Sequence, residues 1–145
     1  MMRKIGIGGD HAGFEYKEEL KKILSSKGFD VTDFGPDSDA STDYPDYVHP
    51  MATAVEKGDL ELGIAICGSG NGVCMTVNKH QDIRGALVWN TELAALARQH
   101  NNANIVCIPS RFIDFDLASE IVDTFLNTDF EGGRHQRRVG KIACQ

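Results

Sequence analysis

Cys67 combines a reactive residue type with a setting that suits chemistry. It ends an Ile-rich apolar run at residues 62–67, which is too short for a helix, and the sequence GSGNG follows at 68–72. Three glycines in five residues let the backbone turn tightly and bring several N–H groups close to a ligand. Residues 73–79 then read as the start of a helix, whose positive end lowers the pKa of a nearby thiol. The stretch predicts a thiolate beside an anion site; a buried structural thiol and a plain turn are the alternatives.

Asp10 and His11 follow another expected strand, at residues 3–8. Ligands bind in open α/β sheets where the strands end, so these side chains are expected at the same rim as Cys67 if the two strands are parallel. Asp10 also fits the N-cap of a helix. Tyr44 lies in the proline-stiffened segment DYPD, where it either lines a pocket or belongs to a surface turn.

Strand and helix patterns alternate along the whole sequence. Short apolar or alternating runs predict strands at 3–8, 29–34, 62–67, 84–89 and 103–108. Apolar residues at helical spacing and helix-capping residues predict helices at 14–27, 47–57, 73–79, 91–99 and 114–127. This alternation predicts one α/β domain over residues 1–145: a doubly wound, Rossmann-like, five-stranded parallel sheet of flavodoxin-like order with helices on both faces. The glycine stretch matches neither GxGxxG nor GxxxxGK, so NAD and ATP are not expected.

The composition, 41% hydrophobic and 25% charged, is that of an ordinary soluble globular protein. With 15 basic and 21 acidic side chains the net charge is −6, which argues against nucleic acid as a partner. No apolar run is long enough to span a bilayer and no signal-peptide pattern opens the sequence, so we expect a cytoplasmic protein without a membrane partner. The four cysteines have neither disulfide-framework nor zinc spacing, so we expect reduced thiols and no metal site.

A basic tail begins at about residue 131. No acidic side chain follows Glu131, whereas Arg134, Arg137, Arg138 and Lys141 lie within eight residues of one another. If the tail is helical, Arg134 and Arg138 share a face at i and i+4, and such a pair suits a doubly charged phosphate. A solvated charged face is the alternative.

Five segments of the sequence carry a family resemblance. They are GDHAG at 9–13, DYP at 43–45, CGSGNG at 67–72, RQHN at 98–101 and EGGRHQRRV at 131–139. Together they resemble the type B ribose-5-phosphate isomerases, a family that also includes the galactose-6-phosphate and allose-6-phosphate isomerases. The match covers the whole chain in order. It implies an enzyme that interconverts an aldose phosphate and a ketose phosphate through an enediolate, without metal or organic cofactor.

The resemblance implies a role for each matching residue. Cys67 would be the base that moves a proton between carbons 1 and 2 of the open sugar, with Ser69 assisting; some branches of the family use a glutamate elsewhere. His100 would open the furanose ring as acid or base, and Asp10 would hydrogen-bond a sugar oxygen. The expected substrate-binding positions are His11, Tyr44, Gly68, Gly70, Asn71, Gly72, Asn101, Arg111, Arg134 and Arg138. Asn102 departs from the aspartate expected after His-Asn, which bears on the polarisation of His100.

The expected substrate is ribose 5-phosphate, interconverted with ribulose 5-phosphate as in the non-oxidative pentose phosphate pathway. The backbone amides of residues 68–72 would hold the enediolate oxygens, and the phosphate would lie against His11, Arg134 and Arg138. The alternatives are the same reaction on a six-carbon sugar phosphate such as allose 6-phosphate, and a non-catalytic phosphosugar-binding module. The resemblance also implies a homodimer, or a dimer of dimers, with each active site shared between subunits.

Overall fold

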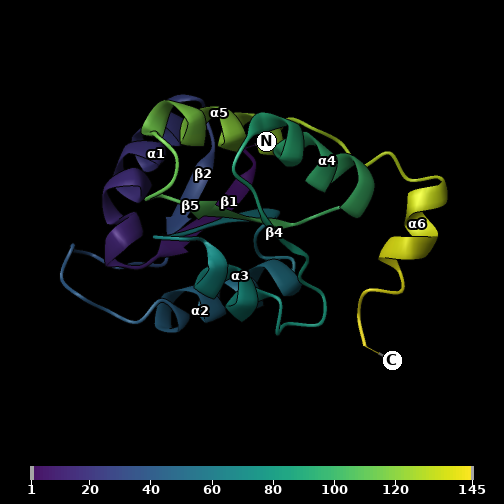
Figure 1. Ribbon diagram of the computed structural model, residues 1–145, viewed down its shortest axis with the longest axis horizontal. Helices are drawn as coiled ribbons and strands as arrows, with labels where there is room; N and C mark the ends of the chain where they lie inside the picture. The colour runs from purple at the N-terminus through teal and green to yellow at the C-terminus, as the bar shows by residue number, and fades with distance from the viewer. Residues whose placement is uncertain (1, 145) are drawn as a thin grey trace.

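Five parallel strands form one sheet in the computed structural model, which describes residues 2–144 (Figure 1). The strands are β1 (Lys4–Gly9), β2 (Asp30–Asp33), β3 (Leu62–Cys67), β4 (Gly85–Leu87) and β5 (Ile105–Pro109). Their order in the sheet is β2-β1-β3-β5-β4. The predicted fold class, a five-stranded parallel sheet with helices on both faces, is confirmed.

The predicted flavodoxin-like order, 2-1-3-4-5, is wrong in its last two strands. β5 pairs with β3, and β4 lies outside β5 at the edge of the sheet. Every residue of β5 is buried, whereas the shorter β4 is only half-buried. A longer, fully apolar strand gains more from a position that is covered on both faces, so β5 takes the inner place.

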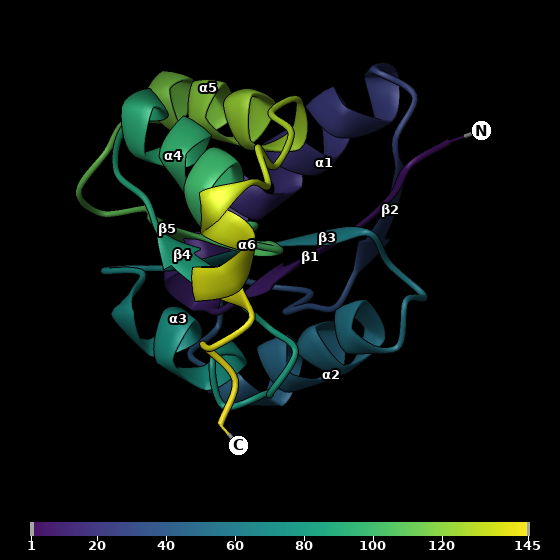
Figure 2. The ribbon, with the colours of Figure 1, turned by 90° about the vertical axis from the view of Figure 1, so that its right-hand side faces the viewer.

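Helices cover both faces of the sheet (Figure 2). On one face lie α1 (Phe14–Ser26), α4 (Thr91–Asn101) and α5 (Phe115–Leu126), and on the other lie α2 (Pro45–Glu56) and α3 (Asn71–Val77). Side chains alternate along β3: Ile64 and Ile66 join the core under α1, α4 and α5, while Ala65 and Cys67 join the core under α2 and α3. The two cores hold the three layers together.

The basic tail forms a short helix, α6 (Arg134–Val139). It packs against the C-terminal end of α4, outside the two helix layers that cover the sheet (Figures 1 and 2). Within residues 2–144, no helix has both the length and the apolar character needed to cross a membrane.

Polar side chains set both ends of α4. Oδ1 of Asn90 accepts the backbone N–H of Leu93 at 2.8 Å, which makes Asn90 the N-cap. Asn102 ends the helix with a φ of 47°, a left-handed conformation that asparagine adopts more readily than most residues. Its Oδ1 accepts a hydrogen bond from Nη1 of Arg98 at 3.0 Å. Asn102 therefore terminates the helix whose last turn carries His100.

Candidate active site

A hollow of about 400 Å³ opens at the carboxyl ends of β1 and β3. The strand order reverses between these two strands, and ligands of open α/β sheets bind at such a point. The lining residues are Asp10, His11, Ala12, Tyr44, Cys67, Gly68, Ser69, Gly72, Arg111 and Phe112. Larger hollows of about 490 and 720 Å³ lie elsewhere, but neither includes Cys67 or Asp10. The hollow at β1 and β3 is the candidate active site because it gathers predicted residues from separate segments of the chain.

Asp10 is both a helix cap and part of the pocket lining. It is only 8% exposed, and its Oδ1 accepts the backbone N–H groups of Ala12 at 2.9 Å and Gly13 at 3.2 Å. It thereby begins the short 3₁₀ helix His11–Gly13 while it still borders the hollow. The N-cap and the expected position at the rim are both confirmed, and the role of Asp10 toward a substrate stays a prediction. Nδ1 of the neighbouring His11 accepts the backbone N–H of Thr42 at 3.3 Å, which fixes the orientation of that ring.

Cys67 is the last residue of β3 and is 4% exposed where it lines the hollow. Its backbone carbonyl accepts hydrogen bonds from the N–H of Ser110 at 3.0 Å and from the Ser110 hydroxyl at 3.2 Å. The same hydroxyl lies 2.8 Å from the carbonyl oxygen of Ala12. Ser110 therefore ties the chain after β5 to the ends of β1 and β3, and this fixes the position of the thiol.

The glycine loop, residues 68–72, leads from Cys67 into α3. Gly70 has a φ of 76°, in the left-handed region that favours glycine. The backbone N–H of Asn71 donates to the Ser69 hydroxyl at 3.2 Å, which tightens the turn. The loop residues that line the hollow are Gly68, Ser69 and Gly72, whereas Gly70 and Asn71 do not line it. The loop therefore borders the hollow at its beginning and at its end.

Tyr44 and Arg111 are far apart in the sequence, but both border the hollow. Tyr44 packs against Gly72 and lines the hollow, as the pocket interpretation of this tyrosine predicted. The backbone N–H of Arg111 donates to the carbonyl of Gly68 at 3.0 Å, and its exposed side chain is available to an anionic ligand. Phe112, 76% exposed, also borders the hollow. Sequence reasoning missed Phe112 because its place depends on β5 lying beside β3.

His100, Asn101, Arg134 and Arg138 do not line this hollow. α4 runs from the carboxyl end of β4 back to the start of β5, so its last turn lies at the end of the sheet where the strands begin (Figure 1). Cys67, the last residue of β3, lies at the other end. Asn101 borders a different hollow, of about 490 Å³. Within one chain, the predicted site residues therefore form two groups, one at the carboxyl ends of the strands and one at the end of the sheet where the strands begin.

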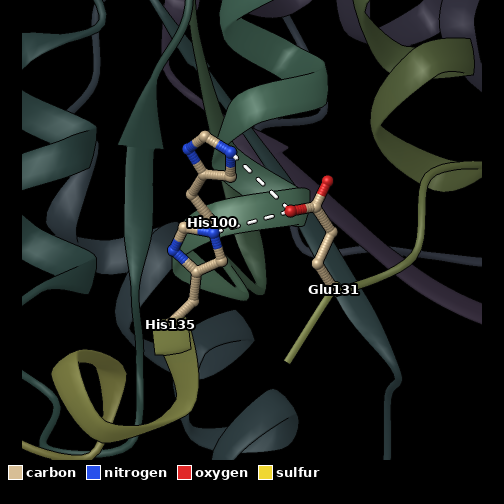
Figure 3. Close-up of side chains that lie close together, drawn as sticks. All are labelled: His100, Glu131 and His135. Carbon is tan, nitrogen blue, oxygen red and sulfur yellow. Dashed lines mark ion pairs between the residues drawn. The ribbon is translucent and has the colours of Figure 1, made fainter. Parts of the chain in front are cut away.

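His100 lies in a cluster with Glu131 and His135 (Figure 3). Oε1 of Glu131 is 3.9 Å from Nε2 of His100 and 3.5 Å from Nε2 of His135. The two imidazole rings stack, with centroids 4.2 Å apart and planes 14° apart. Burial lowers the pKa of His135, and positive charge on His100 and Arg134 lowers it further. Sequence reasoning did not predict this cluster, because its members meet only through the packing of α6 against α4.

Comparison with known proteins places the chain in a family. A family model described as Ribose/Galactose Isomerase matches residues 5–142. The chain belongs to this family. It is 49% identical over 144 residues to the probable ribose-5-phosphate isomerase B of Mycoplasma genitalium, with 98% of this chain and 95% of that protein covered. The resemblance carried by the five sequence segments is thus confirmed.

Two solved structures of the family match the fold closely. A ribose 5-phosphate isomerase from Thermotoga maritima superposes with a TM-score of 0.96, at 46% identity and with 99% of both chains covered. Ribose-5-phosphate isomerase B from Mycoplasma genitalium, solved with bound ribulose-5-phosphate, superposes with a TM-score of 0.93. It is 48% identical to this chain, and the match covers 98% of this chain and 95% of that one.

Proposed function

We propose that this chain interconverts ribose 5-phosphate and ribulose 5-phosphate by a metal-independent mechanism. The observation that carries the proposal is the buried thiol of Cys67 at the end of β3, beside the glycine loop and Arg111. The relative from Mycoplasma genitalium that was solved with ribulose-5-phosphate supports a pentose phosphate as substrate.

In the proposed reaction the Cys67 thiolate is the base. It removes the proton from carbon 2 of the open-chain aldose, and the electron pair of that C–H bond becomes the C1–C2 double bond of an enediolate. The former carbonyl oxygen on carbon 1 takes the negative charge. The thiol then returns the proton to carbon 1, and the hydroxyl proton on O2 moves to O1, which leaves a ketone at carbon 2. The step is an isomerisation, so it needs no oxidant or reductant.

The glycine loop supplies the electrostatic part of this mechanism. Backbone N–H groups of residues 68–72 are proposed to donate to the enediolate oxygens, and each such preorganised donor is worth roughly 3–4 kcal/mol of barrier. The Ser69 hydroxyl, at the edge of the hollow, would assist the base, and Asp10 would hold a sugar oxygen. Loop geometry should therefore affect the rate about as strongly as the base does.

We further propose that two copies of the chain share each active site in a homodimer, with a dimer of dimers as the larger alternative. The Cys67 hollow contains one arginine, Arg111, whereas a doubly charged phosphate suits several cations. Further cations, Arg134 and Arg138, lie on α6 at the edge of the sheet where the strands begin. The last turn of α4, at the same edge, carries His100 and Asn101. A second copy that presents this edge to the hollow would complete the phosphate grip with His11 and supply the histidine that opens the ring.

Subunit mixing tests the shared site. Cys67→Ala and His100→Ala are each expected to be inactive alone. After the two variants are unfolded together and refolded as an equal mixture, random pairing leaves one intact site in each mixed dimer, so about a quarter of wild-type activity should return. If Cys67 and His100 acted within one chain, every site would carry a defect and no activity would return. Wild type refolded in the same way is the control for recovery.

Turnover of the purified protein with ribose 5-phosphate and with allose 6-phosphate, each with EDTA present, tests the reaction. We expect a higher kcat/KM for ribose 5-phosphate, no effect of the chelator, and partial exchange of the transferred hydrogen with D₂O while it resides on the thiol. Preference for the hexose would change the substrate and leave the mechanism in place. Tight binding of both sugars without turnover would instead identify a phosphosugar-binding module.

The cytoplasmic location is also a proposal. Cell fractionation followed by immunoblotting should recover the chain with cytoplasmic markers, and recovery with membranes would contradict it. The expectation that the chain binds no nucleic acid stays a prediction; a gel-shift assay with random-sequence DNA and RNA tests it.

A further inference from the structure

We propose that His100, Glu131 and His135 form a binding site for a divalent transition-metal ion, with Zn²⁺ as the preferred ion, and that the bound ion inhibits the enzyme. One ligand atom from each residue lies within 4.8 Å of the other two. Both imidazoles turn toward the same carboxylate (Figure 3). The three side chains come from the last turn of α4, the segment before α6 and the first turn of α6.

The distances are close to those that a zinc ion requires. Zn–N and Zn–O bonds of about 2.0–2.1 Å in a tetrahedral arrangement place ligand atoms about 3.4 Å apart. The pair His135 Nε2 and Glu131 Oε1, at 3.5 Å, already meets this spacing. The pair His100 Nε2 and Glu131 Oε1, at 3.9 Å, needs about half an ångström of movement. The stacked rings must also turn toward a common point, and the 39% and 51% exposure of the His100 and Glu131 side chains gives them room.

Backbone hydrogen bonds hold the ligands in place. The N–H of Glu131 donates to the carbonyl of Gln99 at 3.1 Å, which fixes Glu131 beside the last turn of α4. The N–H of His135 donates to the carbonyl of Gly132 at 3.1 Å, within a turn where Gly132 has a φ of 69°. A site held by its backbone loses less entropy when it binds an ion than three free side chains would.

The ligand set determines which ion fits. Two imidazoles and one carboxylate suit Zn²⁺ and similar transition metals, whereas Mg²⁺ and Ca²⁺ prefer sites made of oxygen ligands. With neutral imidazoles the three ligands carry one negative charge, which favours a cation. Arg134 and Arg138 lie on the same helix as His135 and weaken the attraction, although both are exposed to solvent. Three protein ligands leave a fourth position open to water, whereas structural zinc sites have four protein ligands.

Inhibition follows because the ion would occupy Nε2 of His100. This part of the inference rests on the proposed function, in which His100 opens the sugar ring. A histidine nitrogen that is bonded to zinc cannot exchange a proton with the substrate. Binding of the ion itself does not depend on the proposed function.

Calorimetric titration of the whole protein with Zn²⁺, and the visible absorption of Co²⁺ as a substitute, test binding directly. We expect one ion per chain, and at least about a 10-fold loss of affinity in Glu131→Gln and in His135→Asn. His49→Asn, which removes an exposed histidine elsewhere on the surface, is the matched control and should bind as wild type does. Absence of binding in wild type, or unchanged affinity in both site variants, would overturn the proposal.

Activity measurements then separate this site from the active-site thiol, which is itself a possible zinc ligand. We expect micromolar Zn²⁺ to inhibit wild type, EDTA to reverse the inhibition, and Glu131→Gln to need at least about 10-fold more Zn²⁺ relative to its own uninhibited rate. Equal sensitivity in Glu131→Gln would place the inhibiting ion outside the cluster, for example at Cys67, and overturn the inhibitory role. A protein that binds zinc at the cluster but turns over no sugar phosphate would refute the proposed function and leave the metal site in place.

Discussion

The ring of Tyr44 lies directly against the backbone of Gly72. A Cβ atom built on Gly72 would come within 2.4 Å of Cζ and 2.6 Å of the hydroxyl oxygen of Tyr44. The two residues therefore fix the spacing between the start of α2 and the start of α3, and both line the hollow that contains Cys67.

Gly72→Ala should consequently damage the site more than the fold. The added methyl group displaces the Tyr44 ring at a cost of about 1–3 kcal/mol of stability, and it shifts the start of α3 away from the substrate. We expect kcat/KM for ribose 5-phosphate to fall by at least about 10-fold in steady-state assays. Tyr44→Ala should cost less stability in the Gly72→Ala background than in wild type, because there it also removes the clash. Equal costs in the two backgrounds would contradict this account.

Gly9→Ala should unfold the protein or nearly so. A Cβ there would lie 2.0 Å from the backbone oxygen of Ile66, and a strand backbone cannot move aside as a side chain can. We expect a loss of more than about 3 kcal/mol of unfolding free energy in urea titrations. Gly140→Ala is the matched control, since its Cβ would meet nothing nearer than 3.4 Å and its φ of −63° suits alanine. That variant should stay within about 0.5 kcal/mol of wild type.

Lys17 and Asp33 should control stability in acid. The Lys17 side chain is 1% exposed, and its Nζ lies 2.9 Å from Asp33 Oδ2. Burial acts to raise the pKa of Asp33, but hydrogen bonds from Lys17, Lys21 and the Gly35 N–H outweigh it and leave the pKa below its ordinary value. A carboxylate with a lower pKa in the folded state stabilises the fold above its unfolded-state pKa of about 4, and this contribution is lost as the pH falls through the folded-state pKa.

Asp33→Asn should therefore lower the unfolding free energy at pH 7 by about 3 kcal/mol, because it leaves the buried Lys17 ammonium with Glu18 as its remaining partner. It should also flatten the decline in stability below about pH 4, measured by urea unfolding at a series of pH values. Lys22→Gln, which breaks an exposed pair with Glu19, should change little at any pH. If the unfolding free energy of Asp33→Asn fell below about pH 4 as steeply as that of wild type, other carboxylates would control stability in acid.

Arg111→Lys should weaken substrate binding. Arg111 is the arginine that borders the Cys67 hollow, and a lysine keeps the charge but loses the planar donor geometry that suits phosphate. We expect KM for ribose 5-phosphate to rise by at least about 10-fold, with a smaller change in kcat. Inorganic phosphate as a competitive inhibitor gives an independent measure, and its inhibition constant should rise in parallel. Unchanged constants for both would place the phosphate away from Arg111.

The meeting of Asp10, His11 and Cys67 was predictable from the sequence. Each follows or ends a short apolar run, and parallel strands end at a common edge. The hydrophobic periodicity of α1 and α5 predicted their positions for the same local reason. Local sequence patterns do not determine which strands pair in the sheet. They therefore could not predict that β5 lies beside β3 and that β4 lies outside it.

The separation of His100 from Cys67 within one chain could have been predicted from the order of strands and helices, although not from the motifs alone. A helix between two parallel strands runs backwards relative to them, so residues in its last turn lie at the edge where the strands begin. The stacking of His100 on His135 had no such signal. It depends on the turn through Gly132 and Gly133, whose positive φ angles direct α6 back toward α4.

The three residues that follow β5, at 110–112, have three different structural roles. The Ser110 hydroxyl donates to the carbonyls of Ala12 and Cys67, Arg111 borders the hollow, and the exposed Phe112 borders it as well. Each task depends on the distance of the residue from Pro109 along the backbone. A substitution here affects one role at a time, but a single inserted or deleted residue would move all three side chains out of place at once. We therefore expect the chain length between Pro109 and Phe112 to matter more for the site than the identity of Phe112.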